Sequence, residues 1–307
     1  MISAAPWKKP ASATLGVFVL LTGSMLLSED YHPPPEVALR PKIVTLRSHH
    51  QVKHLFSSLN YNWETAEEFA PSLLLTSLPH DLDRVPTVAE KKRLFFLSML
   101  PAALLANQEI ALQRKRLLEL CRRLDQGEPL DREEQEFLLR LSRQYKVSGT
   151  PLESAQERTE LLNRVDIIPP ALILAQAACE SGYGTSRFSK LANNLFGEWS
   201  FTPGTGLVPE ERPEGAYYEV RRFNSLYESV QSYLNNLNTH FAYDALRGIR
   251  SQLRSQGAAI TGVTLAEGLR LYSVARERYV ADIKNIIQKN RLSRFSQTQL
   301  LFLTFKG

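Results

Sequence analysis

The feature that most constrains the fold is an apolar segment at residues 171–181, which reads Ala-Leu-Ile-Leu-Ala-Gln-Ala-Ala-Cys-Glu-Ser. Pro169 and Pro170 precede it, and proline suits the first turn of a helix because its missing N–H has no intrahelical partner there. Gly182 follows it and fits the left-handed residue that ends many helices. Since the segment is apolar on nearly all sides, we expect a helix buried in the core of a mainly α-helical domain.

Glu180 carries the one charge of this segment, at its C-terminal end. Burial and the negative end of the helix dipole both disfavour an ionised carboxylate, so we expect the pKa of Glu180 to be raised. A carboxyl group that stays protonated near neutral pH can act as a general acid. The helix alone also allows a simpler alternative, a glutamate at a frayed helix end that points into water.

Two motifs around Glu180 favour the general acid. Residues 176–186 read QAACESGYGTS, and residues 193–197 read NNLFG. Together they resemble the signature of the glucosaminidase family of peptidoglycan hydrolases, glycoside hydrolase family 73. Residues 161–290 resemble its Bax-like branch, through LLNRVDIIP before the helix, SLYESVQSYLNNLNTHFAY after the loop, and LRLYSVARERYVADIKNII near the end.

The resemblance implies a lysozyme-like helical core with a small β-hairpin lobe over the substrate groove. It also implies an endo-β-N-acetylglucosaminidase that cleaves the glycan strands of peptidoglycan, with Glu180 as general acid. The residues themselves also predict the lobe, because residues 199–223 are rich in glycine, proline and aromatic residues. Two strand-like runs there flank Pro213, Glu214 and Gly215, which indicates a short hairpin.

Hydrolysis of a glycosidic bond ordinarily needs a second carboxyl group, as nucleophile or as the base that activates water. The family places this group in the β-lobe. Counting back from the hairpin glycine, Gly215, Glu211 matches the family best. The full set of candidates in the lobe is Glu198, Glu210, Glu211, Glu214 and Glu219.

Further candidates for the site are aromatic and polar. Tyr272 matches an active-site tyrosine of the family that orients the acetamido group or the incoming water, with a core tyrosine as the alternative. Aromatic rings can stack on sugars and amides can donate to N-acetyl groups. Phe196 can equally be a core residue, and Asn194 can cap a turn. The candidate sugar-binding residues are Tyr183, Asn193, Asn194, Phe196 and Trp199.

The N-terminus has the pattern of an export signal. Lys8 and Lys9 precede an uncharged run at residues 11–28, which lacks a clear cleavage site. The run is close to the roughly 20 residues that span a bilayer. We therefore expect an exported, periplasmic protein, either with a cleaved signal or held at the inner membrane by this segment.

The expected organisation follows from composition and periodicity. It comprises a signal or anchor at 1–28, a proline-rich linker at 29–60, a helical preamble at 61–160, the catalytic domain at 161–290 and a basic and apolar tail at 291–307. In the preamble, residues 87–124 have apolar residues at helical spacing, and we expect Pro101 to break them into two helices. Asp131 is the expected N-cap of the next helix. The tail can lie on the membrane or on the catalytic body.

Charge and cysteine content restrict the possible functions less than the motifs do. A net charge of +5 suits nucleic acid, a membrane surface or an acidic wall polymer. The resemblance favours peptidoglycan, so no nucleic acid partner is expected, and the oligomeric state stays open. Cys121 and Cys179 are too few for a disulfide scaffold, and we expect two separate thiols rather than one bridge. Without a phosphate-binding glycine loop or a metal motif, no cofactor and no metal are expected.

Two other classes of function fit the same residues. A lytic transglycosylase also uses a single acid in a lysozyme-like fold, but makes an anhydro product by internal attack. A non-catalytic wall-binding module would keep the groove without activity. Phe223, which stands where the wider family often has tyrosine, favours the second alternative weakly, because a hydroxyl is missing there.

Overall fold

The apolar segment forms the helix α5, Pro170–Ser181. This computed structural model describes residues 41–210, 212, 215 and 218–302. Ten of the twelve residues of α5 are buried. Gly182 ends the helix with a φ of 57°, a left-handed conformation that glycine adopts without a steric cost. The predicted buried helix, with its proline start and glycine end, is therefore confirmed.

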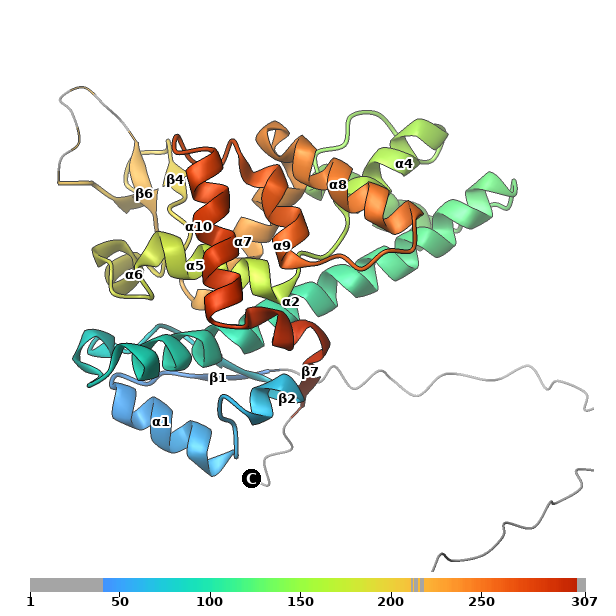
Figure 1. The fold of residues 1–307 in the computed structure, drawn as a ribbon. Coiled ribbons are helices and arrows are strands. Elements are labelled where there is room, and N and C mark those ends of the chain that lie inside the picture. Colours follow the sequence, from blue (N-terminus) through green and yellow to red (C-terminus); the bar gives the residue numbers. More distant parts are fainter. Residues whose placement is uncertain (1–40, 211, 213–214, 216–217, 303–307) are drawn as a thin grey trace, which may run out of the picture. The chain divides into compact units, whose positions relative to one another are not determined.

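Helices make up most of the described chain, and all described residues lie within one compact unit (Figure 1). The predicted fold class, mainly α with a small β-lobe, is confirmed. The other α-helices are α1 (His49–Ser58), α2 (Val88–Asp125), α3 (Arg132–Gln144), α4 (Ala155–Arg164), α6 (Arg187–Ala192), α7 (Leu226–Thr239), α8 (Asp244–Ser255), α9 (Gly262–Leu265) and α10 (Glu277–Lys289). Short 3₁₀ helices are η1 (Thr65–Glu67), η2 (Leu82–Arg84), η3 (Phe241–Tyr243), η4 (Ala266–Leu269) and η5 (Leu292–Gln297).

The helix α2 corrects the prediction at Pro101, because one helix of 38 residues continues through this proline. A proline inside a helix removes one backbone hydrogen bond and leaves the carbonyl four residues earlier without its donor. That carbonyl belongs to Leu97, and it accepts a hydrogen bond of 3.0 Å from the hydroxyl of Tyr61. Packing also supports the helix here, since every residue from Leu94 to Ala103 is buried.

By length and composition α2 is also the one helix of the described chain that could cross a membrane. However, 78% of its most apolar window is buried inside the structure, which is typical of a core helix. The helix packs against α5 and α7, so the preamble shares a core with the region predicted to be catalytic. The expected signal or anchor at residues 1–28 lies outside the described residues.

Two small parallel sheets join segments that are far apart in the sequence. In the first, β1 (Lys42–Val44) pairs with β3 (Leu73–Leu75), and in the second, β2 (Phe69–Pro71) pairs with β7 (Gln299–Leu301). The stretch expected as a linker, residues 29–60, thus contains β1 and α1. The stretch expected as a tail contains η5 and β7, which pack on the preamble.

The β-lobe is a three-stranded antiparallel sheet in the order β4-β6-β5, and Figure 1 labels β4 and β6. Its strands are β4 (Trp199–Ser200), β5 (Gly206–Leu207) and β6 (Glu219–Arg221).

Asp131 caps α3 as predicted, through a bond of 2.8 Å from the backbone N–H of Glu134. Cys121 on α2 and Cys179 on α5 are separate free thiols, also as predicted, and burial raises the pKa of each to about 11.

Candidate active site

Glu180 lies in the last turn of α5 and is only partly exposed. Burial is the largest influence on its carboxyl group and raises the pKa, while a hydrogen bond with Tyr279 of α10 lowers it. The net pKa is raised, in the direction expected from the sequence. The carboxyl group therefore holds its proton to a higher pH than an exposed glutamate does.

A chain of hydrogen bonds leads from the core to Glu180. The buried side chain of Gln176, one helical turn before Glu180, accepts a bond from the hydroxyl of Tyr233 on α7. Its amide nitrogen donates to the hydroxyl of Tyr279 over 2.9 Å. Because the Tyr279 oxygen accepts from an amide, its own proton is available for Glu180. The chain thus fixes both the position of the carboxyl group and the direction of its hydrogen bond.

Tyr272 lies beside this chain. Its ring stacks on Tyr279 with the centroids 5.3 Å apart and an angle of 3°. Its hydroxyl donates to the backbone carbonyl of Phe196 over 2.9 Å. Burial, then the nearby Tyr279 and Glu180, raise the pKa of Tyr272 well above its usual value, so the phenol stays neutral. Tyr272 therefore links Tyr279 of α10 to the Asn-Asn-Leu-Phe-Gly loop.

The Asn-Asn-Leu-Phe-Gly loop passes directly beside the carboxyl group. Gly197 has a φ of 70°, and a Cβ placed on it would lie 3.7 Å from Oε2 of Glu180. Asn194 is buried and ties the loop to β6, since its amide donates to the carbonyls of Glu198 and Arg221, each over 2.8 Å. Asn193 is left-handed at the end of α6 and donates to the carbonyl of Phe223 over 3.2 Å.

A pocket of about 390 Å³ opens next to this loop, between the β-lobe, α7 and η3. Phe196 stacks on Tyr233 at 3.9 Å and is 2% exposed, whereas Trp199 and Phe201 are 51% and 78% exposed. Glu180 itself is not among the lining residues, but its neighbours Gly197 and Tyr272 are. The full lining is Lys146, Phe196, Gly197, Glu198, Trp199, Phe201, Arg221, Ser232, Asn235, Asn236, Thr239, His240, Tyr243 and Tyr272.

Tyr183, another predicted sugar-binding residue, packs against α2. Its ring makes edge contacts with Phe95 and Phe96 of α2, with centroids 5.8 Å apart in each pair. The ammonium group of Lys92 lies 4.8 Å from the centre of the ring. Tyr183 thus joins the predicted catalytic region to the preamble and does not line the pocket beside Trp199.

Glu198 is the lobe glutamate that lines this pocket, with 13% of its side chain exposed. Its Oε2 accepts from the hydroxyl of Ser232 over 2.7 Å and lies 3.6 Å from the guanidinium of Arg221. Its Oε1 is buried and has no partner among the described residues. Burial raises the pKa of Glu198, and Ser232 and Arg221 offset part of this rise.

The other lobe glutamates have different surroundings. Glu219 accepts from the backbone N–H groups of Gly204 and Gly206, over 2.9 and 2.8 Å, and these bonds lower its pKa. Glu210 is 76% exposed and pairs with Arg187 at 3.1 Å. Glu211, which the sequence favoured, and Glu214 both lie outside the described residues. Among the described residues no group of three or more His, Cys, Asp or Glu could hold a metal ion.

Tyr279, Gln176 and Tyr233 were not predicted as functional. Gln176 and Tyr279 both stand in the quoted motifs, but nothing in the motifs says that these side chains meet. They are 103 residues apart in the chain. Burial, then the nearby Glu198 and Glu180, raise the pKa of Tyr243 to about 12. Tyr243 was not predicted as functional either, for the same reason.

Comparison with known proteins identifies the region that contains these groups. The glucosaminidase family, described as mannosyl-glycoprotein endo-beta-N-acetylglucosaminidase, matches residues 155–292. The chain is 32% identical to "Protein bax" of Escherichia coli (strain K12) over 204 residues, 66% of this chain and 71% of that protein. No solved structure matches the chain. The family match runs from α4 to η5 and includes Glu180, the β-lobe and Tyr279.

Proposed function

The chain belongs to the glucosaminidase family, and from this premise we propose that it is an endo-β-N-acetylglucosaminidase that hydrolyses the glycan strands of peptidoglycan. Membership of the family supports a hydrolase that acts on a glycan. The observation that carries the finer proposal is the environment of Glu180, a partly buried carboxyl group with a raised pKa. It lies beside Gly197, at the edge of a pocket with exposed aromatic rings.

In this proposal Glu180 protonates the oxygen of the scissile glycosidic bond. The raised pKa favours the protonated carboxyl group that a general acid needs. The hydroxyl of Tyr279 then stabilises the carboxylate that remains, through the hydrogen bond already present. Because Gln176 holds Tyr279 from the other side, the donor is in position before the reaction and costs no rearrangement.

We assign the second carboxyl group to Glu198, the lobe glutamate that lines the pocket. Burial raises the pKa of Glu198, while the hydrogen bond from Ser232 and the charge of Arg221 oppose this rise and favour the ionised form that the role requires. Its Oε1 has no partner among the described residues but is buried, so the proposal requires that substrate binding uncover this oxygen before it accepts a proton from water or attacks the sugar carbon. Glu211, which matches the family spacing best, is the competing assignment, and the two variants are compared below.

Exposed aromatic rings at the pocket suit a glycan. Trp199 and Phe201 offer faces on which pyranose rings can stack, and the side-chain amides of Asn235 and Asn236 can donate to acetamido groups. Phe201 was not predicted from the sequence. A peptidoglycan substrate lies outside the cytoplasm, so the proposal also requires export, by the segment at residues 1–28 acting as a signal or as an inner-membrane anchor.

The test is mass spectrometry of borohydride-reduced products, after the purified full chain has been incubated with peptidoglycan sacculi. We expect reduced N-acetylglucosamine ends from the wild type and none from Glu180→Gln. Glu119→Gln, which changes an exposed glutamate on α2, is the matched control and should give the wild-type products. Anhydro-muramic ends would favour a lytic transglycosylase, and a wild type without products would favour a wall-binding module.

A further inference from the structure

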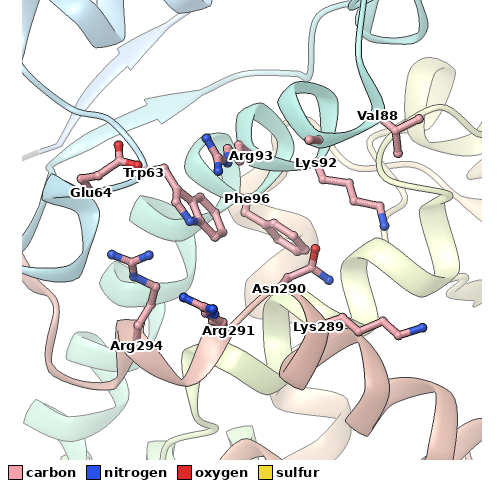
Figure 2. A pocket seen from close by; sticks show the side chains of 11 residues that line it. Trp63, Glu64, Val88, Lys92, Arg93, Phe96, Lys289, Asn290, Arg291 and Arg294 are labelled. Carbon is pink, nitrogen blue, oxygen red and sulfur yellow. The ribbon is translucent and has the colours of Figure 1, made fainter.

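A second, larger pocket of about 640 Å³ lies between the preamble and the end of the catalytic region (Figure 2). Figure 2 shows Trp63 and Phe96 between the basic side chains of α2 on one side and those of α10 and η5 on the other. Five cationic side chains line it against one carboxylate, that of Glu64. We call it the basic pocket, and its cationic residues are Lys92, Arg93, Lys289, Arg291 and Arg294.

Most of these charges are not neutralised by the protein. Within the described part of the chain, only Arg294 has a carboxylate partner, Glu67, at 2.6 Å, and its Nε is buried without any partner. The guanidinium groups of Arg93 and Arg294 lie 5.8 and 5.7 Å from the ring of Trp63, at cation–π distance. Like charges gathered in one concavity repel each other, and a bound anion would remove this cost.

The basic pocket is separate from the candidate active site. The two pockets have no lining residue in common. Tyr279, which contacts Glu180, and Lys289 are at opposite ends of α10, so they are about 15 Å apart along the helix at 1.5 Å per residue. Lys289 therefore lies far from the end of α10 that contacts Glu180.

We propose that the basic pocket binds a phosphate-bearing ligand. Arginine presents a planar fork of donors that matches phosphate oxygens, and the oxygens of one phosphate group can accept hydrogen bonds from several cations at once. A concave site with an aromatic floor suits a group that inserts into it better than a flat anionic surface. Two sources share this chemistry, a free phosphate compound and the headgroup of a phospholipid. The proposal does not depend on the reaction assigned to Glu180.

The test is isothermal titration calorimetry of the full chain with inorganic pyrophosphate, and separately with dihexanoylphosphatidylglycerol below its micellar concentration. The variant is Arg93→Gln/Arg291→Gln, which removes one guanidinium from each side of the pocket. The control is Arg132→Gln/Arg143→Gln on α3, which removes the same charge from exposed positions. We expect saturable 1:1 binding that weakens about tenfold for each pocket guanidinium lost and is unchanged in the control.

The two titrations distinguish the sources. Binding of pyrophosphate alone supports a free phosphate compound, and binding of the lipid, with or without pyrophosphate, supports a headgroup. If neither ligand binds saturably to the wild type, the proposal is overturned. Equal weakening in the pocket variant and in the control would also overturn it, because the interaction would then depend only on net charge. Unchanged glycan cleavage by the pocket variant is expected in every case.

Discussion

The hydroxyl of Tyr61 donates to the carbonyl of Leu97, the group that Pro101 leaves without a backbone donor. We expect Tyr61→Phe to lower the free energy of unfolding by about 1–3 kcal/mol, because a buried carbonyl loses its donor. Urea denaturation followed by circular dichroism measures this change. Activity at low temperature should be unaffected.

The matched background for this substitution is Pro101→Ala, which returns an N–H to position 101. In that background Leu97 has a backbone donor again, so Tyr61→Phe should cost clearly less than it does in the wild type. An equal cost in both backgrounds would show that Tyr61 contributes through packing alone, and that another contact supports the helix at the proline.

Pro101 also shows where prediction from sequence stops. The ends of α5 and the cap of α3 were predicted correctly because Pro170, Gly182 and Asp131 act on backbone groups within a few residues. The rule that proline breaks a helix is also local, and it failed because a hydroxyl 36 residues away replaces the missing donor.

In the candidate site, too, the sequence predicted local features but not contacts between distant residues. The motifs located Glu180 and the loop at Gly197, whose residues are contiguous in the sequence. They gave no sign that Gln176 joins Tyr233 and Tyr279, since those partners are 57 and 103 residues distant and meet only after α5, α7 and α10 have packed. The basic pocket was missed for a related reason, because its cations come from segments about 200 residues apart.

Tyr279→Phe tests the hydrogen bond to Glu180. This bond lowers the pKa of Glu180 against the larger effect of burial, so its loss should raise that pKa further. A general acid works only when protonated, and activity falls as pH rises through its pKa. We therefore expect the alkaline limb of the pH profile of kcat/KM to move to higher pH, with a lower maximum. Release of reducing ends from sacculi measures this profile.

Tyr145→Phe is the control for this profile. Tyr145 is also a buried tyrosine with a bonded hydroxyl, which donates to Gln113 over 3.1 Å, but it lies in the preamble segment. The alkaline limb of the pH profile of Tyr145→Phe should coincide with that of the wild type. If Tyr279→Phe moves the limb to lower pH, Tyr279 does not donate to Glu180 in the active enzyme.

Glu198→Ala tests the second carboxyl group. We expect a loss of activity of about 10²–10⁴-fold, the usual range for a group that transfers a proton in the reaction. Sodium azide should restore part of the activity, because a small anion can occupy the space of the missing side chain and attack the sugar. A glycosyl azide detected by mass spectrometry would identify this route, and its anomeric form would report the face attacked.

Glu210→Ala is the matched lobe variant, since Glu210 is exposed and pairs with Arg187. It should keep wild-type activity. Glu211→Ala decides between the two assignments. If it loses activity and is rescued by azide while Glu198→Ala stays active, the second carboxyl group is Glu211.

Asp166 should make the stability of the fold depend on pH. Burial alone would raise its pKa, but the hydrogen bond from Arg254 and the charges of Arg250 and Arg114 outweigh burial, so the pKa is lowered. A carboxylate with a lowered pKa stabilises the fold above its unfolded pKa of about 3.9, and this stabilisation disappears as pH falls through the folded value. We expect Asp166→Asn to lower the free energy of unfolding by about 3–5 kcal/mol at pH 7, because it leaves Arg250 buried without its carboxylate.

The pH dependence separates this ionic role from simple packing. Urea titrations of wild type and Asp166→Asn should give a difference that is full at pH 7 and shrinks below about pH 4, where the unfolded carboxylate becomes protonated. Glu119→Gln, which removes an exposed partner of Arg122, should follow the wild type at every pH. A difference for Asp166→Asn that stays constant down to pH 2.5 would mean that the side chain supports the fold by its shape and hydrogen bonds. The ion pair of Asp166 with Arg114 of α2 would then contribute nothing to the packing of the preamble against residues 161–290.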